Sequence, residues 1–211
     1  MTIKSTRRNG KAYKKGLMLS VDPSTGATGN VGIALFDKGK LVHLGEVKPD
    51  GKVVHERLRD LSLFFNEKFT DKYELLMLEQ LDWGQGGPSR GKKTYVPKQL
   101  IGAVYVTQAS VEAKKVEEIR PQSWQAMAKY LGDWTTADKS DHMDALWIGI
   151  TCIMLANDWP EQAKFRTKKG RRDAMAIIKE VGTKYDWWEV DSIKNKWENA
   201  TDETVESLFG K

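Results

Sequence analysis

The sequence contains little that would hold a secreted or membrane protein together. Cys152 is the single cysteine among 211 residues, so no disulfide can form within the chain and a reducing, intracellular setting is expected. The longest apolar run, 145–156, is too short to cross a bilayer. The N-terminus also lacks the apolar segment of a secretory signal. These absences favour a soluble globular protein with one main core.

Acidic residues are missing from the places where basic residues gather. The net charge is only +5, but three segments are strongly basic, which suits a polyanion such as nucleic acid. For any one segment, a solubilising surface is an equally good interpretation. The basic residues are Lys4, Arg7, Arg8, Lys11, Lys14 and Lys15, then Arg90, Lys92, Lys93 and Lys98, then Lys164, Arg166, Lys168, Lys169, Arg171 and Arg172.

The hydrophobic pattern predicts an α/β fold. Strands are expected at 17–22, in a hairpin over 31–48 that turns at 37–40, at 75–79 and at 115–120. Helices are expected over 53–70, 98–115, 122–131 and 139–156. A hairpin unit followed by alternating strands and helices predicts a five-stranded mixed sheet flanked by helices.

Outside this unit the character of the sequence changes. Residues 1–16 are interpreted as a flexible basic arm, 17–157 as the main domain, and 158–211 as a basic linker with a small helical C-terminal extension. We expect the tryptophans of the extension to form a small core of their own. They are Trp187, Trp188 and Trp197.

Acidic residues stand where the predicted strands and one helix begin or end. Asp22 ends the first strand, and Glu79 ends the apolar run of the fourth. A right-handed crossover would make these two strands parallel, with both carboxyl ends at one sheet edge, where ligands commonly bind. Asp141 and Asp144 share one face at the start of a helix. We therefore expect four acids in one crevice.

Each acid also has a purely structural interpretation. Asp22 before Pro23 can initiate a turn, Asp141 can cap a helix, and Glu79 can pair with a basic residue. Four converging acids would instead repel one another and need compensating charge. Hard divalent cations bound through oxygen supply it, and two such ions about 4 Å apart can clamp a phosphodiester.

Three segments in this order resemble the RuvC-type Holliday junction resolvases of the RNase H-like (retroviral integrase) superfamily. They are LSVDPSTGATGNVGIALFDKGKLVHLGEV, LLMLEQL and KSDHMDALWIGI, and the resemblance covers residues 17–157. It implies an RNase H-like fold. It also implies that the catalytic and metal-binding acids are Asp22, Glu79, Asp141 and Asp144.

The resemblance further implies a partner and a reaction. A homodimer would bind branched DNA, a four-way junction, and hydrolyse symmetrically related strands with two Mg²⁺ ions, for which Mn²⁺ can substitute. The products would carry 5′-phosphate and 3′-hydroxyl ends. No organic cofactor and no membrane are implied, and the location would be the cytoplasm of a bacterial or phage-infected host cell. The unmatched tail favours a bacteriophage or mobile-element version.

The chain departs from the family pattern beside two of the acids. The first turn reads Asp-Pro-Ser-Thr rather than Asp-Pro-Gly, with an extra residue near Asn30. Asp82 stands where the family often has an aromatic residue, and Trp83 follows it. Trp83 is a candidate for stacking on an unpaired base, or for packing over the sheet edge. The candidate DNA-binding residues are Trp83, Arg90, Lys92, Lys93, Lys98 and Arg120.

Other functions share these acids. Another RNase H-like nuclease of the transposase, terminase or RNA-processing type would have the same set, and a non-catalytic junction-binding protein could keep the fold. His142 lies between the two helix acids but points away from their shared face, so we expect a surface residue there.

Overall fold

The computed structural model describes residues 3–23, 30–80, 98–131, 140–160, 167–190 and 193. The elements follow the predicted order from the first strand to the long helix. They are α1 (Ile3–Gly10), η1 (Lys11–Lys15), β1 (Leu17–Asp22), β2 (Val31–Asp37), β3 (Lys40–Val47), α2 (Val54–Lys68), β4 (Leu75–Glu79), α3 (Lys98–Ser110), β5 (Val116–Ile119), α4 (Pro121–Leu131), α5 (Asp141–Ala156), α6 (Lys168–Lys184) and η3 (Trp187–Glu189).

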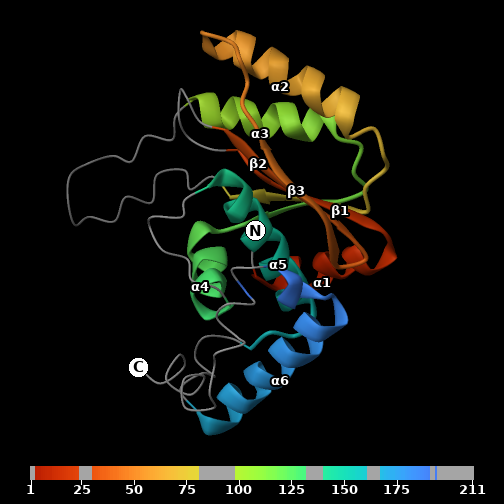
Figure 1. The fold of residues 1–211 in the computed structure, drawn as a ribbon, viewed down its shortest axis with the longest axis vertical. Helices are drawn as coiled ribbons and strands as arrows, with labels where there is room; N and C mark the ends of the chain where they lie inside the picture. The colour runs from red at the N-terminus through yellow and green to blue at the C-terminus, as the bar shows by residue number, and fades with distance from the viewer. Residues whose placement is uncertain are drawn as a thin grey trace, which may run out of the picture.

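The five strands form one mixed sheet in the order β3-β2-β1-β4-β5 (Figure 1). β2 pairs antiparallel with both β1 and β3, whereas β4 is parallel to both β1 and β5. The β2–β3 hairpin turns through Lys38 and Gly39, both at positive φ, as a two-residue hairpin turn requires. The predicted α/β fold with a five-stranded mixed sheet flanked by helices is confirmed.

Helices cover both faces of the sheet (Figure 1). Side chains alternate between the two faces along each strand. In β1, Met18 joins the cluster that includes α4 and α5, while Leu19 and Val21 join the cluster under α2 and α3. The sheet is thus the middle of three layers, and residues two apart in a strand face the same helices.

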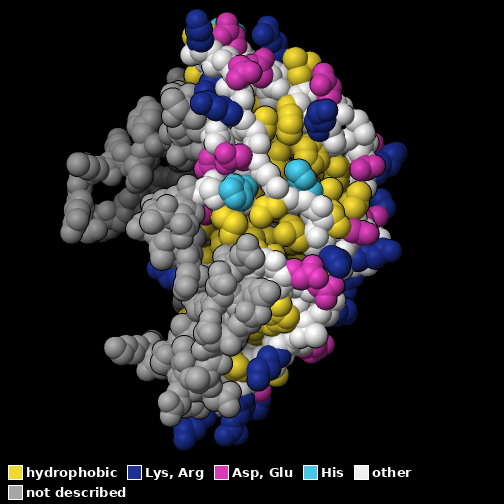
Figure 2. All heavy atoms as spheres, viewed as in Figure 1, with side chains coloured by type: hydrophobic (Ala, Val, Ile, Leu, Met, Phe, Trp, Pro, Cys, Tyr) yellow, Lys and Arg dark blue, Asp and Glu magenta, His cyan; other side chains and the backbone are white. Residues whose placement is uncertain are grey.

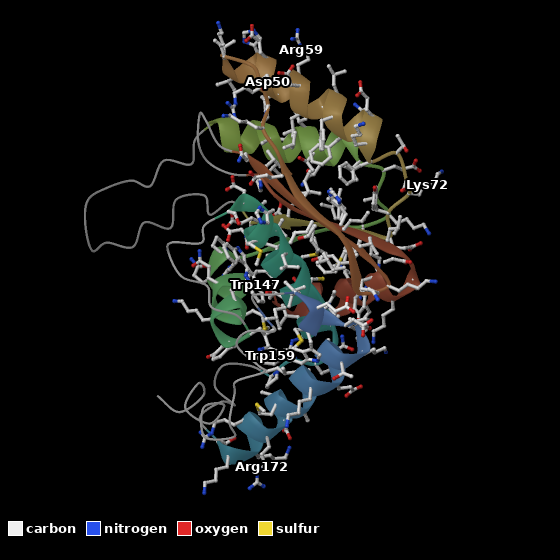
Figure 3. The ribbon with its side chains drawn as sticks, viewed as in Figure 1. Asp50, Arg59, Lys72, Trp147, Trp159 and Arg172 are labelled. Atoms are coloured by element: carbon white, nitrogen blue, oxygen red, sulfur yellow. The ribbon has the colours of Figure 1, made fainter. Side chains whose placement is uncertain are left out.

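Helix α5 lies close against the sheet. A Cβ on Gly149 would come within 2.3 Å of the Phe36 ring, so the missing side chain is what permits the contact. Trp147, also on α5, is buried in the interior of the molecule (Figure 3). Across the described ranges, no helix has the length and apolar character needed to span a membrane.

The N-terminal segment differs from the expected flexible arm. Residues 3–15 form α1 and η1, and Ala12 and Tyr13 are buried in the main core. Arg7 donates from Nη2 to the carbonyl of Trp159, 2.6 Å away. The sequence favoured an arm because most residues of this segment are basic or polar, and only a few apolar residues face the core.

The C-terminal extension shares the main core within the described residues. Ala174 and Ile178 of α6, together with Trp187, belong to the same hydrophobic cluster as α5. The indole of Trp187 donates to the carbonyl of Gly39 at 3.1 Å, and Lys40 pairs with Asp186 at 2.9 Å. Trp187 therefore belongs to the main core and not to the separate small core that was expected. Trp188 packs partly buried against the main cluster, and Trp197 lies outside the described residues.

Helix α3 is shorter than expected because the chain begins to pair with the sheet earlier. It ends at Ser110 rather than 115. Tyr73 donates its backbone N–H to the carbonyl of Glu112 at 2.9 Å and accepts from Lys114 at 2.9 Å. These bonds extend the β4–β5 pairing toward the start of both strands.

Candidate functional site

Asp22 and Glu79 end neighbouring parallel strands. The β1–β4 register pairs Met18 with Leu75 and Val21 with Leu78, so the next step places Asp22 beside Glu79. The crossover prediction about these two strands is therefore correct in the structure. Their carboxyl ends meet at one edge of the sheet.

Both acids face the helix layer that contains α4 and α5. Ser20 donates from Oγ to the carbonyl of Ala145 in α5 at 2.7 Å, and Asp22 follows two residues later on the same face. Leu75 and Met77 of β4 lie in the α5 cluster, so Glu79 has this orientation as well.

Gly32 of β2 brings the start of α5 to the same place. Gly32 pairs with Asp22 across the β1–β2 ladder. A Cβ on Gly32 would lie 1.7 Å from the carbonyl oxygen of Asp141, so the backbone of α5 rests directly on this glycine. The three segments that carry the predicted acids thus converge. Asp144 lies in the same first turn of α5 as Asp141.

The environment of these acids suits cation binding in its donor chemistry. Asp22 is buried, with 5% of its surface exposed, and Glu79, Asp141 and Asp144 are half-buried. Burying a carboxylate is costly unless charge or hydrogen bonds compensate it, and carboxylate oxygens are the ligands that Mg²⁺ prefers. Among the described residues, no three acidic, histidine or cysteine side chains form a metal-binding cluster as they lie. What the structure shares with a divalent-ion site is the type of donor, carboxylate oxygens, at the edge of the sheet where β1 and β4 end.

Glu46 is a further acid of this region that the sequence did not single out. Glu46 pairs with Gly32 on its other side, which puts it in one row with Asp22 across the sheet. It accepts from Asn30 at 2.8 Å, and His142 Nδ1 lies 3.5 Å from its other oxygen. The signal that could have found Glu46 is its position two residues after inward-facing Leu44. His142 was expected at the surface. It is half-buried, next to Glu46 at the end of this row.

Trp124 of α4 is a second residue that sequence reasoning missed. Its side chain is buried, and its indole Nε1 donates to Oε1 of Glu79 at 3.2 Å. No motif marks Trp124, since the contact depends on how α4 packs after β5. A hydrogen bond from a buried donor fixes the direction of a carboxylate oxygen.

The structure describes only part of the expected DNA-binding set. Trp83, Arg90, Lys92 and Lys93 lie outside the described residues, and Lys98 is the first residue of α3, with its side chain outside them. Arg120 is exposed at the end of β5 and donates from Nε to Oε1 of Gln80 at 3.3 Å. Arg120 therefore lies at the edge of the sheet that carries Glu79.

Four residues of the C-terminal basic cluster, Lys168, Lys169, Arg171 and Arg172, lie at the start of helix α6, while Lys164 and Arg166 lie outside the described residues. Figure 2 shows Lys and Arg side chains gathered at the lower end of the view, and Arg172 points outward there in Figure 3. The first turn of α6 contains no acidic residue, although the helix dipole favours acids there. Lys169 pairs with Asp173 at 2.7 Å. This cluster therefore presents positive charge to solvent.

Two solved structures of RuvC from Thermus thermophilus are similar to this chain. One, in complex with Holliday junction substrate, is 17% identical and covers 64% of this chain and 91% of that chain, with a TM-score of 0.44. The second is 15% identical and covers 64% of this chain and 92% of that chain, with a TM-score of 0.42. No protein-family model and no curated protein matches the chain. At these values the likeness concerns the fold, which the strand order establishes independently.

Replacing Gly32 with alanine is expected to damage this site. The added methyl would overlap the Asp141 backbone, at 1.7 Å from its oxygen and 2.2 Å from its carbonyl carbon, so the start of α5 must move. We expect a loss of about 1–3 kcal/mol of folding free energy or more, measured by urea unfolding.

Gly45→Ala is the matched control for this strand glycine. Its added Cβ would meet only the tip of the flexible His43 side chain, at 3.1 Å. We expect Gly45→Ala to leave the free energy of unfolding within about 0.5 kcal/mol of the parent. Equal stability of the two variants would contradict the close α5 contact.

Proposed function

We propose that this protein is a divalent-metal-dependent endonuclease that cuts four-way DNA junctions as a homodimer. The observation that carries the proposal is the meeting of three segments at one sheet edge. Asp22 and Glu79 end adjacent strands, and the backbone of Asp141 rests on Gly32, the cross-strand neighbour of Asp22. Carboxylates brought to one edge from distant parts of the sequence would repel one another, and a functional cation would offset that cost.

Each acid has a proposed part in holding two Mg²⁺ ions, for which Mn²⁺ can substitute. The proposed metal-binding and catalytic residues are Asp22, Glu79, Asp141 and Asp144. Held by these carboxylates, such ions would supply Lewis-acid activation of the scissile phosphate and of the attacking water. The protein contributes rigidity: β1 and β4 are fixed by the sheet, and α5 is fixed by Gly32 and by the Ser20–Ala145 hydrogen bond.

The basic segments are the proposed contacts to the DNA backbone. The residues proposed for this role are Arg90, Lys92, Lys93, Lys98 and Arg120, while Trp83 is proposed to stack on an unpaired base. Arg120 supports the proposal best among the described residues because it is exposed at the edge that carries Glu79. Cations there would lie beside a phosphate held at the acids.

A cleavage panel tests the proposed function. The substrates are a synthetic four-way junction, a linear duplex of the same sequence, and an RNA hairpin, each with and without MgCl₂. One of the similar structures contains Holliday junction substrate, which makes the junction the first substrate to test. We expect paired, symmetrically placed cuts in the junction only, and only with the metal present.

The other outcomes assign the protein elsewhere. Equal cutting of the linear duplex or of RNA would make it a different RNase H-like nuclease. Tight junction binding without cleavage under any divalent ion would make it a binding protein. A single cut per junction at a sizing mass of one chain would contradict the homodimer.

A further inference from the structure

We propose that Trp124 is a positioning residue for Glu79. This inference rests on the proposed function, in which Glu79 holds a metal ion. The indole Nε1 of Trp124 donates to Oε1 of Glu79 at 3.2 Å, and the ring is 2% exposed. A buried donor aimed at the carboxylate of a proposed metal ligand is the arrangement that orients such ligands in metal sites.

The chain path places Trp124 beside Glu79. β5 lies next to β4, and their register pairs Glu79 with Ile119. α4 then begins at Pro121, whose fixed φ suits the first position of a helix. The N–H groups of Ser123 and Trp124 donate to the carbonyl of Arg120, which fixes the first turn on the end of β5. Trp124 therefore reaches Glu79 from a rigid element.

The kind of donor matters as much as its position. An indole N–H is neutral and has no acceptor atom, so it can orient a carboxylate without neutralising it. Arg120 lies at the same edge, yet its Nε donates to the neutral amide oxygen of Gln80 at 3.3 Å. A guanidinium on Glu79 would compete with a bound cation, whereas the indole leaves the negative charge of Glu79 in place for it.

The test compares two tryptophan-to-phenylalanine variants in the full chain. Trp124→Phe removes the N–H and keeps an aromatic ring. Trp187→Phe is the matched control, since Trp187 is also 2% exposed and also donates one indole hydrogen bond, but to the backbone of Gly39. We expect Trp124→Phe to raise the MgCl₂ concentration for half-maximal junction cleavage about 10–100-fold. Trp187→Phe should leave it unchanged, and the melting temperatures of the two variants should be similar.

A second measurement does not depend on cleavage. In ¹⁵N-labelled protein without DNA, MgCl₂ should shift the indole N–H resonance of Trp124 and not that of Trp187, and the shift should vanish in Glu79→Gln. If the parent cuts no DNA but this shift is seen, the proposed function fails while the positioning role stands. Two cleavage results would overturn the role: an unchanged MgCl₂ requirement in Trp124→Phe, or equal changes in both variants. An MgCl₂-induced shift of the Trp124 indole resonance that persists in Glu79→Gln would overturn it as well.

Discussion

Cleavage of a four-way junction should fall by about 10³-fold or more when Asp22 is replaced by asparagine, with junction binding retained. The amide has nearly the shape of the carboxylate, so the fold should persist, but one negative ligand for the proposed cations is lost. A loss of several kcal/mol in transition-state stabilisation, at about 1.4 kcal/mol per tenfold, gives this magnitude. The measurements are single-turnover cleavage with MgCl₂ and a gel-shift titration without it.

Asp37→Asn is the matched control for this change. Asp37 also ends a strand, but it pairs with Leu17 at the opposite end of β1 from Asp22, and it is exposed. We expect Asp37→Asn to cut at the parental rate, and Asp144→Asn to behave like Asp22→Asn. Junction cleavage that survives in both Asp22→Asn and Asp144→Asn would remove the acids from the reaction.

The melting temperature of Asp22→Asn is a second measurement on the same variant, because removing the charge of Asp22 relieves repulsion among the acids. If Asp22 is held near Glu79 and the first turn of α5 mainly for function, removing its charge should not lower the melting temperature. A large drop in melting temperature would instead indicate that Asp22 is a structural residue of the turn after β1.

Tyr13→Ala should lower the free energy of unfolding by about 3–5 kcal/mol, the usual range for truncating a large buried ring. Tyr13 is fully buried, and its ring meets that of Tyr185 edge to face at 5.8 Å between centroids. Its hydroxyl lies 2.8 Å from the hydroxyl of Tyr185 and accepts from Asn157 Nδ2 at 2.8 Å. Urea unfolding followed by circular dichroism measures the change.

Tyr105→Ala is the control for this truncation, because Tyr105 is 63% exposed on α3. We expect it to change the free energy of unfolding by less than about 0.5 kcal/mol. If Tyr13→Ala changed the free energy of unfolding as little as Tyr105→Ala, the N-terminal segment would be the flexible arm that its sequence predicts. Tyr13 would then not pack in the core.

Alkaline unfolding separates the hydroxyl of Tyr13 from its ring. Burial, with a further contribution from the hydrogen bond to Tyr185, raises the pKa of Tyr13 above its ordinary value of 10.0. Because the folded state keeps the group neutral, its contribution to stability is complete below pH 10.0 and is lost as the pH rises toward the raised value. Tyr13→Phe should therefore show a shallower loss of unfolding free energy above pH 10 than the parent.

Much of the sheet could be predicted because its signals are local. The apolar run ending at Glu79, the hairpin turn at Lys38 and Gly39, and the helix start after Ser140 each depend on neighbouring residues. The parallel placement of β1 and β4, with Asp22 and Glu79 at their carboxyl ends, also followed from the sequence, since right-handed crossovers leave few ways to arrange parallel strands. Whether these acids bind metal stays a prediction.

The contacts that could not be predicted join distant segments. Gly10 ends α1 at a point where an added Cβ would lie 3.1 Å from Sγ of Cys152. This close approach between α1 and α5 depends on Cys152, which is 142 positions away in the sequence, so the residues around Gly10 do not predict it. The bond from Trp124 to Glu79 likewise depends on the orientation of α4, which no periodicity encodes.

The hydrogen bond between Tyr13 and Tyr185 has a consequence for synthesis on the ribosome. The two residues are 172 positions apart, and Trp187 reaches back to Gly39 across 148 positions. The packing of η1 therefore cannot be complete until Tyr185 has been translated, because loop closure over such separations comes late. Before Tyr185 has been made, η1 can pack against α5, but Tyr13 lacks the ring and the hydroxyl of Tyr185.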